Sequence, residues 1–173
     1  MILKSYEIKK IKFQKNNLIL FYGKNEALKD QAIKLINKNK QIFIFDEKEI
    51  LENQNNFLET VTTKSLFEEE KIILIKRASD KILKIIEYVY SKDLKDINII
   101  VNSDELEKKS RLRSFFEKEK ECICVPFYPD NEQTLFKVAL NFVKEKNISL
   151  SASNINFIVN RSNGDRKVLT SEL

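Results

Sequence analysis

Short runs of consecutive apolar residues recur along the chain, and each is followed by a polar or amphipathic stretch. Five such runs, rich in Ile, Val and Phe, lie at 18–22, 41–45, 71–76, 97–101 and 121–125. Apolar runs of about four to eight residues without alternation are typical of strands that are buried on both faces. The pattern therefore predicts five strands of one sheet.

Apolar residues at helical spacing predict helices between these strands, over 25–38, 80–90 and 105–118. Strands that alternate with helices indicate a parallel sheet with helices on both faces, which is an α/β fold.

After Pro126 and Pro129 the strand pattern stops, and amphipathic helices are predicted over 131–146, from Ser151 onward and over 166–173. Asn163-Gly164 is expected to close the second helix, and Asp165 to cap the third. The sequence thus predicts two domains, 1–128 and 129–173. Because the last helix runs to the final residue, we expect the second domain to be incomplete.

Positive charge is concentrated near the amino terminus. The chain has 31 basic and 26 acidic residues, and the first 40 residues contain ten Lys but only Glu7, Glu26 and Asp30 as acids. Such a section is compatible with a polyanionic partner. The chain is rich in Lys overall, with 26 Lys to 5 Arg, so biased composition is the favoured explanation.

The two cysteines and the absence of histidine limit the chemistry. Cys122 and Cys124 lie two apart on a predicted strand, and the chain has no second Cys pair and no His to complete a zinc site. We expect both to be small, reduced core residues. No apolar run approaches the ~20 residues of a membrane span, and no signal peptide is recognised, so a cytoplasmic protein without a membrane partner is expected.

The junction at Gly23-Lys24 is the strongest candidate for chemistry. A phosphate-binding loop, G-x-x-x-x-G-K-S/T, occupies such a strand-to-helix junction in ATPases, because its backbone N–H groups wrap the phosphates. Here Gly23 is the only glycine before Gly164. The third strand then runs into Lys76-Arg77, where an ATPase of this layout needs acids for Mg²⁺. The sequence predicts a degenerate, non-functional nucleotide site with no catalytic residue, no metal and no cofactor.

Two further segments are candidates for binding. In Ser65-Leu66-Phe67 two adjacent apolar residues stand between polar stretches; they either pack under the third strand or face outward as a plug for a pocket. A basic cluster is a weak candidate for DNA contact, with an ordinary amphipathic helix as the alternative; its cations are Lys108, Lys109, Arg111 and Arg113. Asp104-Glu105 before it is expected to cap that helix rather than bind a metal.

Four segments of the chain resemble the delta subunit of the bacterial DNA polymerase III clamp loader, both in sequence and in their order and spacing. They are the Ser65-Leu66-Phe67 motif, the 104–113 stretch, the proline turn at 127–132 and Asn163-Gly164-Asp165. The resemblance extends from about residue 18 to residue 173.

The resemblance implies a RecA-like AAA+ domain with a five-stranded parallel sheet, followed by a helical lid. The family's carboxy-terminal collar domain is not in this sequence. Family members do not hydrolyse ATP; they bind the ring-shaped beta sliding clamp and open it, and the residues that enter the clamp would here be Leu66 and Phe67. Implied partners are the clamp, the gamma/tau and delta prime subunits and primed DNA. The implied setting is a DNA-directed DNA polymerase holoenzyme in the cytoplasmic, nucleoid-associated replisome.

The chain departs from active relatives at the start of the last helix. They carry a sensor arginine in a G-x-x-R pattern, whereas here Lys167 takes that place and Arg166 comes one residue early. A delta-prime-like stator is a further alternative, but it requires Ser-Arg-Cys where this chain has Ser110-Arg111-Leu112. An inactive nucleic-acid-binding module that uses the basic amino-terminal section also remains open.

Overall fold

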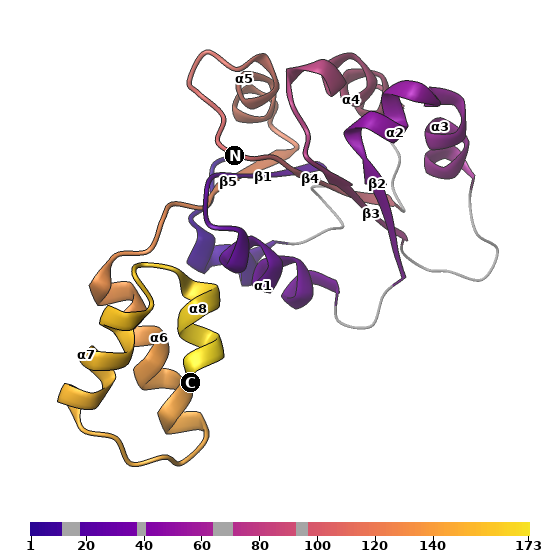
Figure 1. The fold of residues 1–173 in the computed structure, drawn as a ribbon. Helices are drawn as coiled ribbons and strands as arrows, with labels where there is room; N and C mark the ends of the chain where they lie inside the picture. Colours follow the sequence, from indigo (N-terminus) through magenta and orange to yellow (C-terminus); the bar gives the residue numbers. More distant parts are fainter. Residues whose placement is uncertain (12–17, 38–40, 64–70, 93–96) are drawn as a thin grey trace.

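The centre of the molecule is a five-stranded parallel sheet with strand order β2-β3-β4-β1-β5 (Figure 1). The computed structural model describes residues 1–11, 18–37, 41–63, 71–92 and 97–173. The strands are β1 (Leu18–Tyr22), β2 (Ile42–Asp46), β3 (Lys71–Lys76), β4 (Ile97–Asn102) and β5 (Cys122–Pro126). Each predicted strand is confirmed to within one residue. The central strands β1 and β4 are buried along their whole length, which explains the uninterrupted apolar sequence of β1 and the largely apolar sequence of β4.

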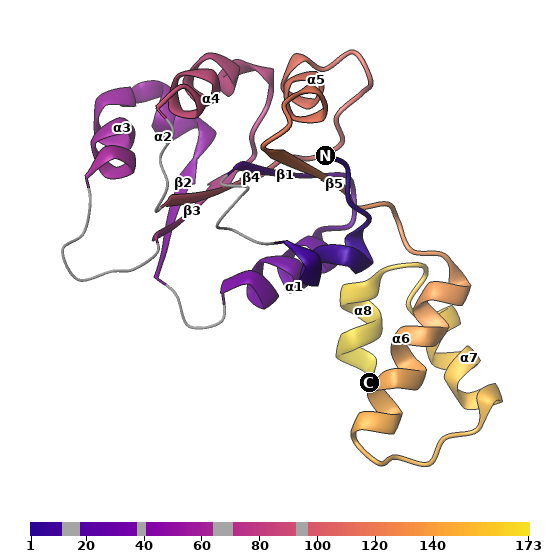
Figure 2. The ribbon, with the colours of Figure 1, turned by 180° about the vertical axis from the view of Figure 1, so that it is seen from behind.

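Helices cover both faces of this sheet. Side chains of β1 alternate between the faces, so Leu18 and Leu20 join one apolar cluster while Ile19 and Phe21 join another. One face carries η1 (Ser5–Lys10) and α1 (Glu26–Asn37), and the other carries the helices that follow β2, β3 and β4 (Figures 1 and 2). These are α2 (Glu47–Glu52), α3 (Gln54–Thr62), η2 (Asp80–Ile82), α4 (Leu83–Tyr90) and α5 (Arg111–Lys118). The predicted α/β class is therefore confirmed.

The helix predicted over 105–118 is shorter than expected. α5 begins at Arg111, where the Ser110 hydroxyl accepts a hydrogen bond from the Arg113 N–H. Asp104 and Glu105 thus belong to the loop after β4, and their expected role as helix caps is wrong. Helices α2 and α3 and the short η1 were not predicted at all.

The amino terminus lies along β5. Ile2 forms a parallel bridge with Cys124, and the Met1 ammonium donates to the Cys122 carbonyl oxygen at 2.6 Å. Both cysteines are free and fully buried, as the sequence predicts. Within the described residues, no helix is both long and apolar enough to span a membrane.

Three helices after β5 form a unit with its own apolar cluster. They are α6 (Glu132–Glu145), α7 (Ala152–Arg161) and α8 (Arg166–Glu172). The side chains of the predicted cap Asp165, and of Asn131 and Ser151 at the predicted starts of the other two helices, each accept backbone N–H bonds. Asn163 and Gly164 have φ of 47° and 82°, the left-handed end that the sequence indicates for α7. Among the described residues, this cluster shares no member with the two clusters of the sheet. Contact between the two parts must therefore be made by other groups.

Candidate functional site

The turn from β1 into α1 uses its own backbone N–H groups internally. Gly23 N–H donates to the Asp104 carbonyl oxygen at 3.1 Å, and Asn25 N–H donates to the Phe127 carbonyl oxygen at 3.3 Å. The Asn25 side chain accepts from the Leu28 N–H at 3.1 Å and so satisfies another donor of the first turn of α1. A phosphate group that used these N–H groups would have to displace the protein acceptors to which they are bonded.

Gly23 is fixed by packing as well as by its backbone conformation. Its φ is 122°, and a Cβ at this position would overlap the Phe127 carbonyl oxygen. Phe127 is fully buried, and its ring meets that of Phe21 edge to face at a centroid distance of 4.9 Å. The glycine therefore lets the strand-to-helix turn lie against the segment that leaves β5.

The cations of the predicted degenerate nucleotide site are mostly paired with nearby acids. Lys24 forms an exposed ion pair with Glu105 at 2.9 Å, and Arg77 pairs with Asp46 at the edge of the sheet. Lys76 is exposed at the end of β3. Because β4 separates β3 from β1, Lys76 and Arg77 are about 10 Å from the Gly23 turn in the sheet direction. Gly23, Lys24, Lys76 and Arg77 all lie at the carboxyl ends of strands, but they do not form one cluster.

Beneath the turn, a lysine is completely buried. Lys29 of α1 donates to the Ser103 carbonyl oxygen at 2.7 Å and pairs with Glu26, one helical turn before it. A buried ammonium group needs such partners to offset its lost hydration. Lys29 thus links α1 to the residue that follows β4. Its burial was not predicted, because the sequence shows it only as one of ten lysines in a basic segment.

A cleft of about 410 Å³ opens between the Gly23 turn and the three-helix unit. Its wall on the sheet side includes Lys24 and Asn25, and its wall on the helical side includes Asn163, Gly164 and Arg166. Within the described chain, no group of three or more Cys, Asp or Glu side chains is placed to hold a metal ion.

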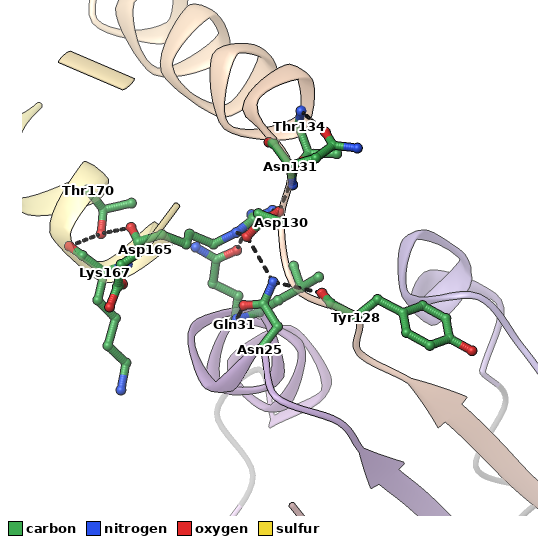
Figure 3. A network of polar contacts seen from close by, with 11 residues as sticks. Asn25, Gln31, Tyr128, Asp130, Asn131, Thr134, Asp165, Lys167 and Thr170 are labelled. Carbon is green, nitrogen blue, oxygen red and sulfur yellow. Dashed lines mark hydrogen bonds and ion pairs between the residues drawn. The ribbon is translucent and has the colours of Figure 1, made fainter. Parts of the chain in front are cut away.

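Asp130 lines the cleft, and both of its carboxylate oxygens accept hydrogen bonds. The Arg166 guanidinium binds it through two bonds, Nε to Oδ2 at 2.7 Å and Nη2 to Oδ1 at 2.6 Å. Asn25 Nδ2 donates to Oδ2 at 2.8 Å and Thr134 Oγ1 donates to Oδ1 at 3.0 Å, and Figure 3 shows Asp130 between these two residues. We call Asp130, Asn25, Thr134 and Arg166 the Asp130 network.

The electrostatics of the network favour a charged Asp130. Burial acts to raise the pKa of the carboxyl group, but the hydrogen bonds and charge of Arg166, with help from Asn25, outweigh it and lower the pKa below 3.8. Arg166 and Asp130 side chains are 10% and 5% exposed, so water screens this ion pair little. In the sequence Arg166 is one residue before the expected sensor position, and no local pattern there indicates Asp130 as its partner.

The other predicted binding residues have different outcomes. Ser65, Leu66 and Phe67 lie outside the described residues, so their expected role stays a prediction. In the basic cluster, Lys108, Lys109 and Arg111 are exposed. Arg113 is not: it bonds Glu117 at 2.7 Å and the Leu106 carbonyl oxygen at 3.1 Å, and it stacks over Tyr22. It supports the start of α5 and is not free for a phosphate.

The strand order, the helices on both faces and the following helical unit define the class: this is the RecA-like fold of AAA+ proteins. No protein-family model matches the sequence, and a search of curated proteins finds no match either.

Solved structures with this fold include several replication and recombination proteins. The DNA clamp loader delta protein of Bacillus subtilis aligns with a TM-score of 0.67 and 14% identity, over 96% of this chain and 54% of that one. Domain III of the replication initiation protein DnaA of Thermotoga maritima gives 0.55 at 14% identity, over 96% and 78%. The RuvB Holliday junction branch migration motor of Thermotoga maritima gives 0.54 at 12% identity, over 96% and 55%. The chain thus spans about half of the delta protein, and at these identities the likeness establishes the fold alone.

Proposed function

We propose that this chain is a delta-type subunit of a DNA clamp loader, which binds and opens the sliding clamp without hydrolysing ATP itself. The observation that carries the proposal is the likeness to the Bacillus subtilis delta protein over 96% of the chain, which includes both the sheet and the three-helix unit. The residue motifs of the same family occur in the sequence in matching order.

The absence of ATP hydrolysis is inferred from the Gly23 turn. Hydrolysis requires a loop of free N–H groups for the phosphates and acids that hold Mg²⁺. Here the N–H groups of Gly23 and Asn25 are already bonded to protein carbonyl groups. At the end of β3, Lys76 and Arg77 stand where the acids would be needed, and Arg166 is held by Asp130.

Clamp binding is assigned to Leu66 and Phe67, flanked by Ser65. The segment that contains them follows α3 and leads into the amino end of β3, whereas the Gly23 turn lies at the carboxyl end of β1. In a parallel sheet the amino end of β3 and the carboxyl end of β1 lie at opposite ends of the strands. Side chains that are fully desolvated in a partner's pocket are where binding hot spots cluster.

The remaining parts of the proposal follow from the same resemblance. Residues 1–128 would form the RecA-like domain and 129–173 part of the lid domain. Partners would be the sliding clamp, gamma/tau and delta prime subunits and primed DNA, within the cytoplasmic polymerase holoenzyme. Of the basic cluster, Lys108, Lys109 and Arg111 would make any weak DNA contact.

Binding of the purified chain to a bacterial beta sliding clamp tests the proposal. A Leu66→Ala/Phe67→Ala variant should lose about 2–4 kcal/mol of affinity or more. Phe157→Ala is the matched control, because Phe157 on α7 is 63% exposed and lies outside the proposed contact. Equal affinity of all three proteins would remove Leu66 and Phe67 from the interface. No clamp binding by the wild-type chain, with folding verified by circular dichroism, would refute the proposed function.

A further inference from the structure

The two parts of the molecule meet through polar groups rather than through a common core. The apolar cluster of the three-helix unit is separate from both clusters of the sheet in the described chain. Within the described residues the peptide chain crosses between the two parts once, after Phe127. A single crossing leaves rotation of the helical unit unrestrained unless side chains fix it. The helices that come together across this boundary are α1 and α8.

The Asp130 network lies at this boundary and joins several elements. Asn25 begins α1, Asp130 belongs to the crossing segment, Thr134 lies in the first turn of α6 and Arg166 begins α8. Arg166 also reaches Gln31 of α1, from Nη1 to Oε1 at 3.4 Å. Asn25 adds a second bond across the boundary, from Nδ2 to the Tyr128 carbonyl oxygen at 3.1 Å, and Figure 3 shows Gln31, Asn25 and Tyr128 around Asp130.

The geometry of the Asp130 network fixes the position of α8 relative to the crossing segment. A two-bond contact between guanidinium and carboxylate fixes orientation as well as distance. Four donor bonds satisfy the carboxylate completely, so the charge is buried with its partners in place. By contrast, the neighbouring pair of Lys167 and Asp30 is 3.9 Å apart and more than half exposed, which makes it weak.

We propose that Asp130 is a built-in latch, which holds the three-helix unit against the sheet by binding Arg166 and Asn25, with no need for a ligand in the cleft. The Asp130 carboxylate is the anion that pairs with Arg166, which lines the cleft. The orientation of the helical unit is then a property of the chain itself. This inference stands apart from clamp binding and does not depend on it.

Hydrogen exchange of the 173-residue chain tests the latch, with Asp130→Asn and Arg166→Lys as the test variants. Asparagine keeps the shape of Asp130 but loses its charge, and lysine keeps the charge of Arg166 but loses the two-bond contact. We expect exchange of amides in α8 and in the first turn of α6 to accelerate about tenfold or more in both, since each variant loses the two-bond contact between buried charges. Amides of the central strands β1 and β4 should keep their wild-type rates.

Lys167→Gln is the matched control, because it removes the adjacent exposed ion pair of the same helix and should leave all rates unchanged. An Asp130→Asn/Arg166→Lys double variant should be less perturbed than the sum of its two single variants, because both remove the same contact. Added Mg·ATP should not alter exchange in the wild-type chain. The latch is overturned by unchanged rates in α6 and α8, by equal acceleration in β1 and β4, or by slower exchange in these helices when Mg·ATP is added.

Discussion

The backbone of Gly23 packs directly against the carbonyl group of Phe127, so closely that residue 23 has no room for a Cβ. In a phosphate-binding loop, glycine lets a ligand approach the backbone. Here another part of the chain occupies that approach, and the Asn25 N–H bonds the same carbonyl oxygen. The single glycine of the junction therefore serves packing of the crossing segment, which explains why it is present without its phosphate-loop companions.

Replacing Gly23 by alanine should destabilise the chain by about 3 kcal/mol, because it adds a clash with backbone to a φ of 122°. Gly164→Ala is the matched control: its φ is 82°, but its Cβ would meet nothing within 4 Å, so only about 1 kcal/mol is expected. Urea unfolding measured by circular dichroism compares the two. Similar losses in both variants would show that close packing at Gly23 is unimportant.

Asp80 should make stability depend on pH in acid. Burial acts to raise the pKa of its carboxyl group, but hydrogen bonds from the Ser110 hydroxyl and the Leu112 and Arg111 N–H groups outweigh it, so the pKa lies below 3.8. A lowered pKa in the folded state means that the stabilisation is complete above pH 3.8 and is lost as the pH falls through the folded-state value.

Unfolding free energies measured between about pH 5 and pH 2.5 should therefore fall less steeply in Asp80→Asn than in the wild-type chain. The variant should also be less stable near neutral pH, because the start of α5 loses its charged acceptor. Parallel pH profiles for the two proteins would contradict the role given to this carboxylate.

The two cysteines should resist alkylation in the folded protein. Burial raises the pKa of both thiols to about 12, so almost no reactive thiolate exists near pH 8. Iodoacetamide labelling followed by mass spectrometry should proceed slowly at about pH 8 and become fast when denaturant is added. Rapid labelling of the folded chain would mean that β5 opens readily.

The basic cluster divides into binding and structural cations. A Lys108→Gln/Lys109→Gln/Arg111→Gln variant should stay as stable as the wild type, while the salt slope of any DNA binding falls by roughly three. Arg113→Gln should cost about 1 kcal/mol of stability, since Arg113 bonds Glu117 and Leu106 and stacks on Tyr22. DNA titrations at several salt concentrations, with unfolding curves, distinguish the two groups. A loss of DNA affinity in Arg113→Gln alone would reverse the assignment.

The sheet was predictable because burial on both faces leaves a strong local signal. Strands such as β1, Leu18–Tyr22, are continuously apolar, and the central position of β1 in the sheet is the reason. The caps of α6, α7 and α8 were predictable for the same kind of reason, since Asn131, Ser151 and Asp165 act within their own first turns.

The features that were not predicted depend on partners distant in the sequence or on segments of weak helix propensity. α2 has only six residues, and Asp46 caps it. α3 is capped by Asn53 and begins with Gln54, Asn55 and Asn56, and asparagine is a poor helix former. The start of α5 is set by Ser110 together with Asp80, thirty residues earlier. Asp130 and Arg166 are 36 residues apart, so no local pattern links them.

The central claim is that the chain binds a sliding clamp and needs no nucleotide to do so. Calorimetric titration of the purified chain into a beta clamp, with and without Mg·ATP, measures this directly. The account predicts the same dissociation constant in both titrations, weakened in each by Leu66→Ala/Phe67→Ala. Binding that appears only with Mg·ATP, or no binding in either condition, would contradict it.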